Sequence, residues 1–373
     1  MTDIAAVSSA ETEEDDQDLI DESAEPFAAP ESITYYGSDF DVHGLVRRLD
    51  QGDILVPNFY PSDEGVIDLA GFQRGFVWRK YQMDRFVESL LLGYPVPGIF
   101  LIQQSDKKLL VLDGQQRLRT LQQFYRGTLD EGAAFRLESV GVAFKNLAYE
   151  DLSEDDRRAL DDNFIHATII RYNPDAHGDE AVYQLFERLN TGGTNLYPHE
   201  IRVALYPGTL VDFIRDLNLE PNWRLLFGNR SGRLKDQELI LRFLALYKNA
   251  DNYSRPLKSF LNNFLKDHRN MEGLDRDSLS DLFRNSCAAL AQGPGQRAFR
   301  SQRQVNAALV DSVLVGVATR LAQGPIDDVR RLTAAFDSLI ADGDFQTAIG
   351  RATADEARVA LRLEKAISAF ANV

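Results

Sequence analysis

The stretch DGQQR at residues 113–117 combines residue types and spacing that suit the recognition of an anion. An apolar run at residues 109–112 predicts a buried strand before it, and the helical spacing of the apolar residues after it predicts a helix that begins at Gln115. A strand, a glycine turn and a helix N-terminus favour negative charge, through free N–H groups and the helix dipole. Arg117 and Arg119 add guanidinium groups suited to phosphate.

Asp113 has three possible roles from the sequence alone. Its carboxylate can cap the following helix, orient Arg117 or hold a metal ion. A turn with an Asx cap and solvated glutamines would explain the same residues without any ligand.

DGQQR after an apolar strand resembles the signature of the family found at the N-terminus of GmrSD-type modification-dependent restriction endonucleases. Two further stretches match its pattern in the same order, FQRGFVWRKYQMDRFVESLLLGYPVPGIFL at residues 72–101 and LFERLNTGGTNLYPHEI at residues 185–201. The resemblance covers residues 45 to about 206, and three ordered motifs are more specific than one.

The resemblance implies a ParB/sulfiredoxin-like fold that binds a nucleoside triphosphate, with or without Mg²⁺. It implies catalytic roles for Asp113 and Arg117, and makes Asp113 the candidate metal ligand. The nucleotide-binding residues that it implies are Arg74, Gly114, Gln115, Gln116, Arg117, Thr120, Asn190, Thr191 and Gly193.

The acidic charge of the chain is concentrated at its N-terminus. The formal charge is −16, but residues 1–46 hold 13 Asp and Glu and no Lys or Arg, which leaves −3 for the remainder. Residues 1–32 have little to bury, and we expect them to be a disordered acidic tail. The remainder is close to neutral, so nucleic-acid binding is compatible with its charge.

The single cysteine, Cys287, excludes an internal disulfide and a multi-cysteine zinc site, and its apolar surroundings predict a buried thiol. No signal peptide is visible, and no apolar run approaches the ~20 residues of a membrane span. These features predict a cytoplasmic protein without a membrane partner.

The pattern up to residue 206 alternates strands and helices. Strands are expected at residues 54–56, 99–103, 109–112, 134–137 and 165–171, with a hairpin between the second and third. Helices are expected at residues 42–49, 79–92 and 180–189, after Ser153 as a capping residue, and from Pro198. Glu200 in the first turn of the last helix suits a structural role at least as well as catalysis.

Strand signals vanish after residue 207. Helices are expected at residues 210–217, 238–247, 257–266, 279–292, 304–321, 326–339 and 354–370. The predicted fold is therefore α+β, with a disordered tail at residues 1–32, a ParB/sulfiredoxin-like mixed-sheet domain at residues 33–206 and an all-helical domain at residues 207–373.

Residues 223–269 form a basic region, with ten Lys and Arg against four acidic residues and with interleaved aromatic residues. Cations among aromatics suit contacts to a nucleic-acid backbone and stacking on bases, although helical spacing also places aromatics in a core. Arg230, Arg233 and Lys235 are the candidate DNA-binding residues.

The five histidines do not follow an HNH nuclease pattern, and none lies beyond His268, so HNH nuclease activity is not expected. We expect a nucleotide-dependent sensor or switch, an NTPase if it hydrolyses its ligand, in defence against foreign or modified DNA. The alternative is a non-catalytic module whose DGQQR grips a DNA phosphate, and the third choice is a nuclease domain. Expected partners are a nucleotide, DNA, and a separate nuclease or modification-system protein.

Overall fold

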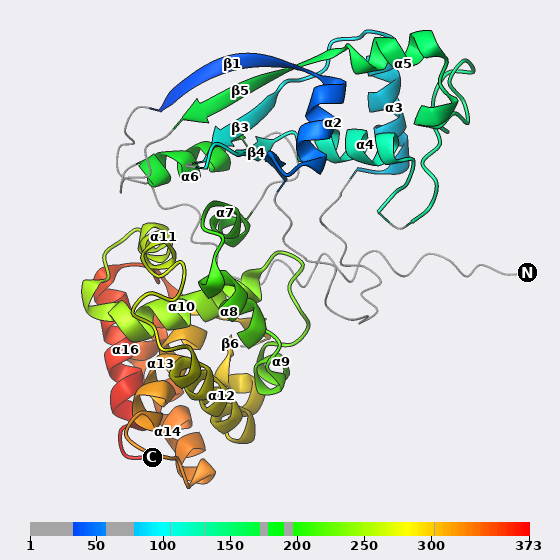
Figure 1. Ribbon diagram of the computed structural model, residues 1–373. Coiled ribbons are helices and arrows are strands. Elements are labelled where there is room, and N and C mark those ends of the chain that lie inside the picture. The colour runs from blue at the N-terminus through cyan, green and yellow to red at the C-terminus, as the bar shows by residue number, and fades with distance from the viewer. Residues whose placement is uncertain are drawn as a thin grey trace, which may run out of the picture. The chain divides into compact units, whose positions relative to one another are not determined.

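The computed structural model describes residues 33–56, 78–104, 106–130, 132–171, 178–189, 197–301 and 303–373. These residues fall into two compact units, divided between residues 196 and 197. The first unit is a mixed sheet with helices, and the second is almost entirely helical (Figure 1). The predicted α+β class is confirmed.

The sheet of the first unit has five described strands, which are β1 (Thr34–Asp41), β2 (Ile54–Leu55), β3 (Ile99–Gln103), β4 (Leu109–Asp113) and β5 (Phe164–Arg171). Their order across the sheet is β1-β5-β3-β4-β2. β3 and β4 pair antiparallel, which confirms the predicted hairpin. β3 runs parallel to β5, β4 runs parallel to β2, and β1 pairs antiparallel with β5. The sheet is therefore mixed, and β4 lies inside it.

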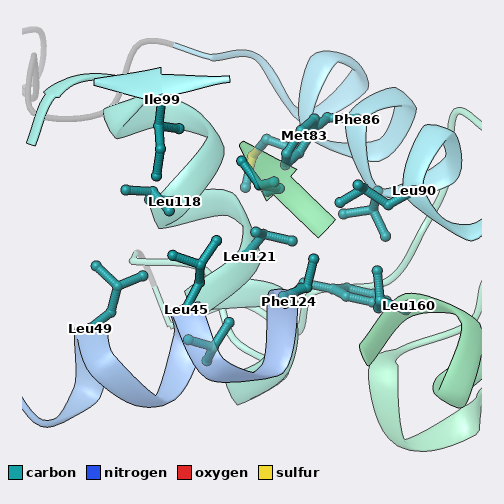
Figure 2. Packing of buried hydrophobic residues seen from close by; sticks show 14 of the residues in the cluster. Leu45, Leu49, Met83, Phe86, Leu90, Ile99, Leu118, Leu121, Phe124 and Leu160 are labelled. Atoms are coloured by element: carbon teal, nitrogen blue, oxygen red, sulfur yellow. The ribbon is translucent and has the colours of Figure 1, made fainter. Parts of the chain in front are cut away.

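The helices described in the first unit are α2 (Val42–Asp50), α3 (Lys80–Leu91), α4 (Gln115–Arg126), α5 (Glu154–Asp161) and α6 (Gly178–Leu189), with the 3-10 turn η1 (Tyr149–Asp151). Apolar side chains of α2, α3, α4 and α5 share one core with alternate residues of β3, β4 and β5. Figure 2 shows Leu45 from α2, Leu90 from α3 and Leu121 from α4 in this core. The core fixes α4, and with it the residues that precede α4.

The other set of alternate strand residues is buried as well. Ile102, Leu110 and Leu112 are each at most 4% exposed, although they point away from the first core. α6 packs against β4 and brings buried apolar residues such as Val182 and Phe186. Both sides of β4 are thus covered, which explains why residues 109–112 form a continuous apolar run.

The structure confirms several elements that the sequence predicts for this unit. The Ser153 hydroxyl accepts a hydrogen bond from the Asp156 N–H at 3.1 Å, so α5 begins as expected. The helix expected at residues 42–49 is α2, and the strand expected at residues 54–56 is the short edge strand β2.

Two features differ from the sequence-based expectation. β1 was not expected, because its polar residues and Gly37 have low strand propensity; pairing with β5 supplies its stability. The strand expected at residues 134–137 is wrong. Phe135 and Leu137 are fully buried, but only Ala134 pairs, in an isolated bridge with Thr128.

The second unit contains ten described α-helices, α7 (Pro198–Leu205), α8 (Thr209–Leu217), α9 (Pro221–Phe227), α10 (Lys235–Asn249), α11 (Leu257–Asp267), α12 (Arg276–Gln292), α13 (Ala307–Leu321), α14 (Val329–Ala341), α15 (Gly343–Gly350) and α16 (Glu356–Phe370). It also contains the 3-10 turns η3 (Ala250–Asn252) and η4 (Gly295–Ala298) and the small hairpin β6 (Arg300–Ser301) and β7 (Gln304–Val305). All seven helices expected here are present. α9 and α15 were missed, and the helix expected from residue 304 begins at Ala307, where Asn306 caps it.

α13 is the central helix of the second unit. Residues 307–318 are all buried, and α13 packs against α10, α12 and α16. The buried Asp311 carboxylate on α13 accepts hydrogen bonds from Arg242 of α10 (2.7 Å) and Arg362 of α16 (3.0 Å). Cys287 on α12 is fully buried as expected, and burial raises the pKa of its thiol.

In the part of the chain that the structure describes, no helix has both the length and the apolar character needed to cross a membrane.

Candidate functional site

The DGQQR stretch lies where β4 ends and α4 begins. Asp113 is the last residue of β4, Gly114 is the N-cap residue with φ +98°, and Gln115 is the first residue of α4. The expected strand, turn and helix are therefore present at these residues.

Gly114 is required here for two reasons. A positive φ strains any residue that has a Cβ atom. A Cβ at this position would also lie 2.4 Å from Cγ2 of Ile99, at the start of β3. The turn therefore lies directly against the neighbouring strand, and the close approach of its backbone depends on glycine.

The N-terminus of α4 is electrostatically suited to an anion. It has no side-chain cap and no acidic residue in its first turn. The first N–H groups of an α-helix have no acceptor within the helix, and the N–H of Leu118 is the first to bond a helical carbonyl, that of Gly114, at 3.0 Å. Asp113 does not cap the helix, which removes one of its three candidate roles.

Arg117 lies close to the same turn and pairs with Asp113. One guanidinium nitrogen, Nη2, is 2.6 Å from the Asp113 carboxylate. The Arg117 side chain is 12% exposed and that of Asp113 is 47% exposed. The Nε atom of Arg117 is buried and has no hydrogen-bond partner among the described residues. Asp113 therefore orients Arg117 through one contact and leaves the Nε donor unused.

Gln116 ties α4 to the segment that enters α3. Its side-chain oxygen accepts a hydrogen bond from the backbone N–H of Trp78 at 3.1 Å. The Trp78 ring is half-buried and packs edge-on against Phe86 of α3, with ring centroids 5.4 Å apart. Trp78 is a packing residue, and Gln116 has a structural role in addition to any contact with a ligand.

Thr120 and Arg119 are two further polar residues of α4, the first buried and the second half-buried. Thr120 is fully buried, and its hydroxyl has no hydrogen-bond partner in the described part of the chain. Burial lowers the pKa of the Arg119 guanidinium, and the Asp130 carboxylate partly opposes this shift. Thr120 follows Gln116 and Arg117 by four and three residues, so the three residues share one side of α4.

Four predicted site residues lie outside the described residues. Arg74, Asn190, Thr191 and Gly193 belong to residues 57–77 and 190–196, whose structure is not described. Among the predicted residues, the structure brings together Asp113, Gly114, Gln115, Gln116, Arg117 and Thr120.

Metal ligands do not converge on this turn. No group of three or more His, Cys, Asp or Glu side chains that could hold a metal ion occurs among the described residues. Asp113 is engaged with Arg117. The described donor set therefore does not fit a protein-held metal ion.

The aromatic residues of the basic region at residues 223–269 are mainly core residues. Trp223 and Phe243 are fully buried and Phe260 is 7% exposed, so these rings are not available for base stacking. For these three rings the helical spacing reflects a place in the core, which is the other interpretation that the sequence allows.

Two of the three candidate DNA-binding cations contact Tyr197. The Arg233 guanidinium lies 4.6 Å from the centre of the Tyr197 ring, and the Lys235 ammonium lies 5.1 Å from it. Arg233 also reaches Glu200 at 3.5 Å. These cations thus stabilise the beginning of α7, whether or not they also bind DNA.

Glu200 has the structural role favoured by its position. It is 4% exposed, and its carboxylate accepts a hydrogen bond from the N–H of Tyr197 at 2.6 Å, which caps α7.

His199 was not identified from the sequence. It is 1% exposed, and neither ring nitrogen has a hydrogen-bond partner among the described residues. Burial, followed by the nearby Arg202 charge, lowers its pKa to about 3. Nothing in the local sequence distinguishes it from an exposed histidine.

Comparison with known proteins finds a family whose pattern spans the candidate site. Residues 59–207 match the family described as the N-terminal domain of the GmrSD restriction endonuclease. The chain is also 24% identical over 299 aligned residues to the uncharacterized protein MJ0686 of Methanocaldococcus jannaschii, an alignment that covers 55% of this chain and 50% of that protein. The chain thus spans about half the length of that relative.

Proposed function

Because residues 59–207 match the N-terminal domain family of the GmrSD restriction endonuclease, we propose that this part of the chain binds a nucleoside triphosphate at the DGQQR turn. In this proposal it acts as a nucleotide-dependent sensor or switch in defence against foreign or modified DNA. The family is associated with modification-dependent restriction. The binding of a nucleotide is our proposal.

The uncapped N-terminus of α4 beside Arg117 is the observation that carries this proposal. Backbone N–H groups, the helix dipole and a guanidinium act on the same small volume, and each favours a phosphate oxygen. Gly114 lets the backbone turn without side-chain atoms of its own. The buried hydroxyl of Thr120 and the buried Nε of Arg117, both unbonded among the described residues, are further polar groups that a ligand would satisfy.

The proposal includes no hydrolytic step. Hydrolysis would need groups that orient water and offset phosphate charge, and the described residues do not assemble them around Asp113. In this proposal, Mg²⁺ binds together with the triphosphate and is not held by protein ligands. The partner that would recognise the nucleotide-bound form is a separate nuclease or modification-system protein.

Titration of the whole chain with each of the four triphosphates, with and without Mg²⁺, tests the proposal by calorimetry. We expect Arg117→Ala to weaken binding about tenfold to a hundredfold, because a charge-assisted contact contributes roughly 1.5–3 kcal/mol. Arg126→Ala is the matched control, since Arg126 lies at the other end of α4 and pairs with Asp50 at 2.5 Å. Its affinity should equal that of the unmodified chain.

Unchanged affinity in a folded Arg117→Ala variant would contradict the proposed site. Binding of DNA without binding of any triphosphate would instead favour a module that grips a DNA phosphate at the same turn.

A further inference from the structure

Asp113 is an anion placed beside a site that suits anions. Its carboxylate lies 2.6 Å from Nη2 of Arg117, one residue before the turn at Gly114. α4 itself has no acidic residue in its first turn. A phosphate bound to Arg117 and to the first N–H groups would therefore meet the charge of Asp113 at short range.

The two partners of this ion pair differ in exposure. The Arg117 side chain is 12% exposed, whereas the Asp113 side chain is 47% exposed. Asp113 can move into water at little cost, because an exposed carboxylate is well hydrated. Arg117 is held by its surroundings and keeps one buried nitrogen without a partner among the described residues. The Asp113 carboxylate is therefore the member of the ion pair that a phosphate can replace.

Asp84 shows how a structural carboxylate of this unit is held. Asp84 is fully buried and accepts hydrogen bonds from the N–H groups of Glu138 (3.1 Å) and Ser139 (3.0 Å), in addition to Lys80. In the described part of the chain, the Asp113 carboxylate contacts only Arg117. Asp113 thus lacks the additional bonds expected of a carboxylate with a purely structural role.

We propose that Asp113 is the built-in counter-ion of the phosphate site, which holds Arg117 while the site is empty and is displaced by the phosphate that enters. This inference rests on the proposed function and adds regulation of the same site. It predicts that Asp113 opposes phosphate binding, so a neutral residue at this position strengthens it. A catalytic or metal-binding Asp113 would have the opposite effect, or none, on binding without metal.

Binding of inorganic pyrophosphate to the whole chain, in buffer with a chelator and without metal, tests this inference. Pyrophosphate carries the phosphate charge without a base or sugar, so its affinity reports on the turn alone. We expect Asp113→Asn to bind about threefold to tenfold more tightly than the unmodified chain, because one competing charge is removed. Asp113→Ala, which removes the same charge by truncation, should show the same direction.

Asp50→Asn is the matched control. It removes the same charge from the ion pair with Arg126 at the opposite end of α4, and its affinity should not change. The double variant Asp113→Asn with Arg117→Ala should lose the gain, since the freed guanidinium is then missing. Thermal melting of each variant confirms that the compared chains are folded.

The outcomes separate this inference from the proposed function. Equal or weaker binding by both folded Asp113 variants, with measurable binding by the unmodified chain, would overturn the counter-ion role and leave the phosphate site standing. A gain that Asp50→Asn reproduces would also overturn it, since net charge alone would then explain the effect. No binding of pyrophosphate or triphosphate by any chain would overturn both.

Discussion

Single residues determine how closely the backbone can approach at the candidate site. Gly114 combines a positive φ with a position where a Cβ would lie 2.4 Å from Ile99. The sequence predicts the turn, because glycine follows a strand and precedes a helix. It does not predict the contact with Ile99, since that contact depends on how β3 pairs with β4.

The single buried residue His199 should make the free energy of unfolding depend on pH. Its folded pKa is about 3, below the ordinary value of 6.5. Between these values the unfolded chain binds a proton that the folded chain excludes, so stability is full above pH 6.5 and falls as pH decreases toward 3. The expected loss from pH 7 to pH 5 is about 2 kcal/mol in the free energy of unfolding.

Urea unfolding at pH 7 and pH 5 measures this loss, with the buried Trp223 as a fluorescent reporter within the helical unit. His199→Leu should remove about 2 kcal/mol of the pH dependence and leave the contribution of the carboxylates. His268→Gln, in the same unit, should retain the dependence of the unmodified chain. The same slope in His199→Leu and in the unmodified chain would show that His199 does not exclude its proton.

At the scale of elements, the apolar pattern of the sequence predicts which side chains are buried better than it predicts which segments pair as strands. Residues 134–137 alternate between buried and exposed as a strand would, yet no described strand lies beside them to complete a ladder. The opposite case is β1, where a polar segment becomes a strand because β5 offers an edge. Both outcomes depend on neighbours distant in sequence, which local periodicity does not contain.

Three helices of the second unit meet at one buried carboxylate. Asp311 of α13 is fully buried and pairs with Arg242 of α10 and Arg362 of α16, both at most 3% exposed. Asp311→Ala would remove the buried carboxylate that both guanidinium groups share, and we expect a loss of about 3–5 kcal/mol in the free energy of unfolding. Thermal and urea unfolding of the variant measure this loss.

An exposed ion pair in the same unit is the control. Asp337→Ala breaks the contact of Asp337 with Arg297, where both side chains are more than half exposed. The expected loss there is about 0–1 kcal/mol. Comparable losses in the two variants would contradict a special role for the Asp311 cluster.

At the scale of the whole molecule, charge is distributed unevenly along the chain. Residues 1–46 carry 13 acidic residues and no Lys or Arg, whereas residues 223–269 carry ten basic and four acidic residues. The sequence alone shows this asymmetry. It does not show that Trp223 and Phe243 belong to the core, or that Arg233 and Lys235 lie over Tyr197. Because these two rings are not available for base stacking, we expect DNA binding by this region to depend mainly on charge.

We expect weak DNA binding through residues 223–269 that decreases steeply with salt. Three phosphate contacts would lower the affinity about fortyfold between ~50 and ~200 mM salt, because each contact releases counterions. Removal of residues 1–32, which hold 11 acidic residues and no basic ones, should strengthen binding. Fluorescence anisotropy at the two salt concentrations measures both effects with the full-length and shortened chains.

Charge reversal to Glu at Arg230, Arg233 and Lys235 should lower the affinity for every DNA sequence alike, because phosphate contacts position a protein without reading bases. The same reversal at Arg284, Arg330 and Arg331, which are exposed residues of the helical unit outside this region, is the matched control. Melting curves are needed as well, since reversal at Arg233 also removes its contact with Glu200. Equal losses in the two triple variants would mean that DNA responds only to net charge. Failure of the full-length and shortened chains to bind at ~50 mM salt would leave these cations as supports of α7.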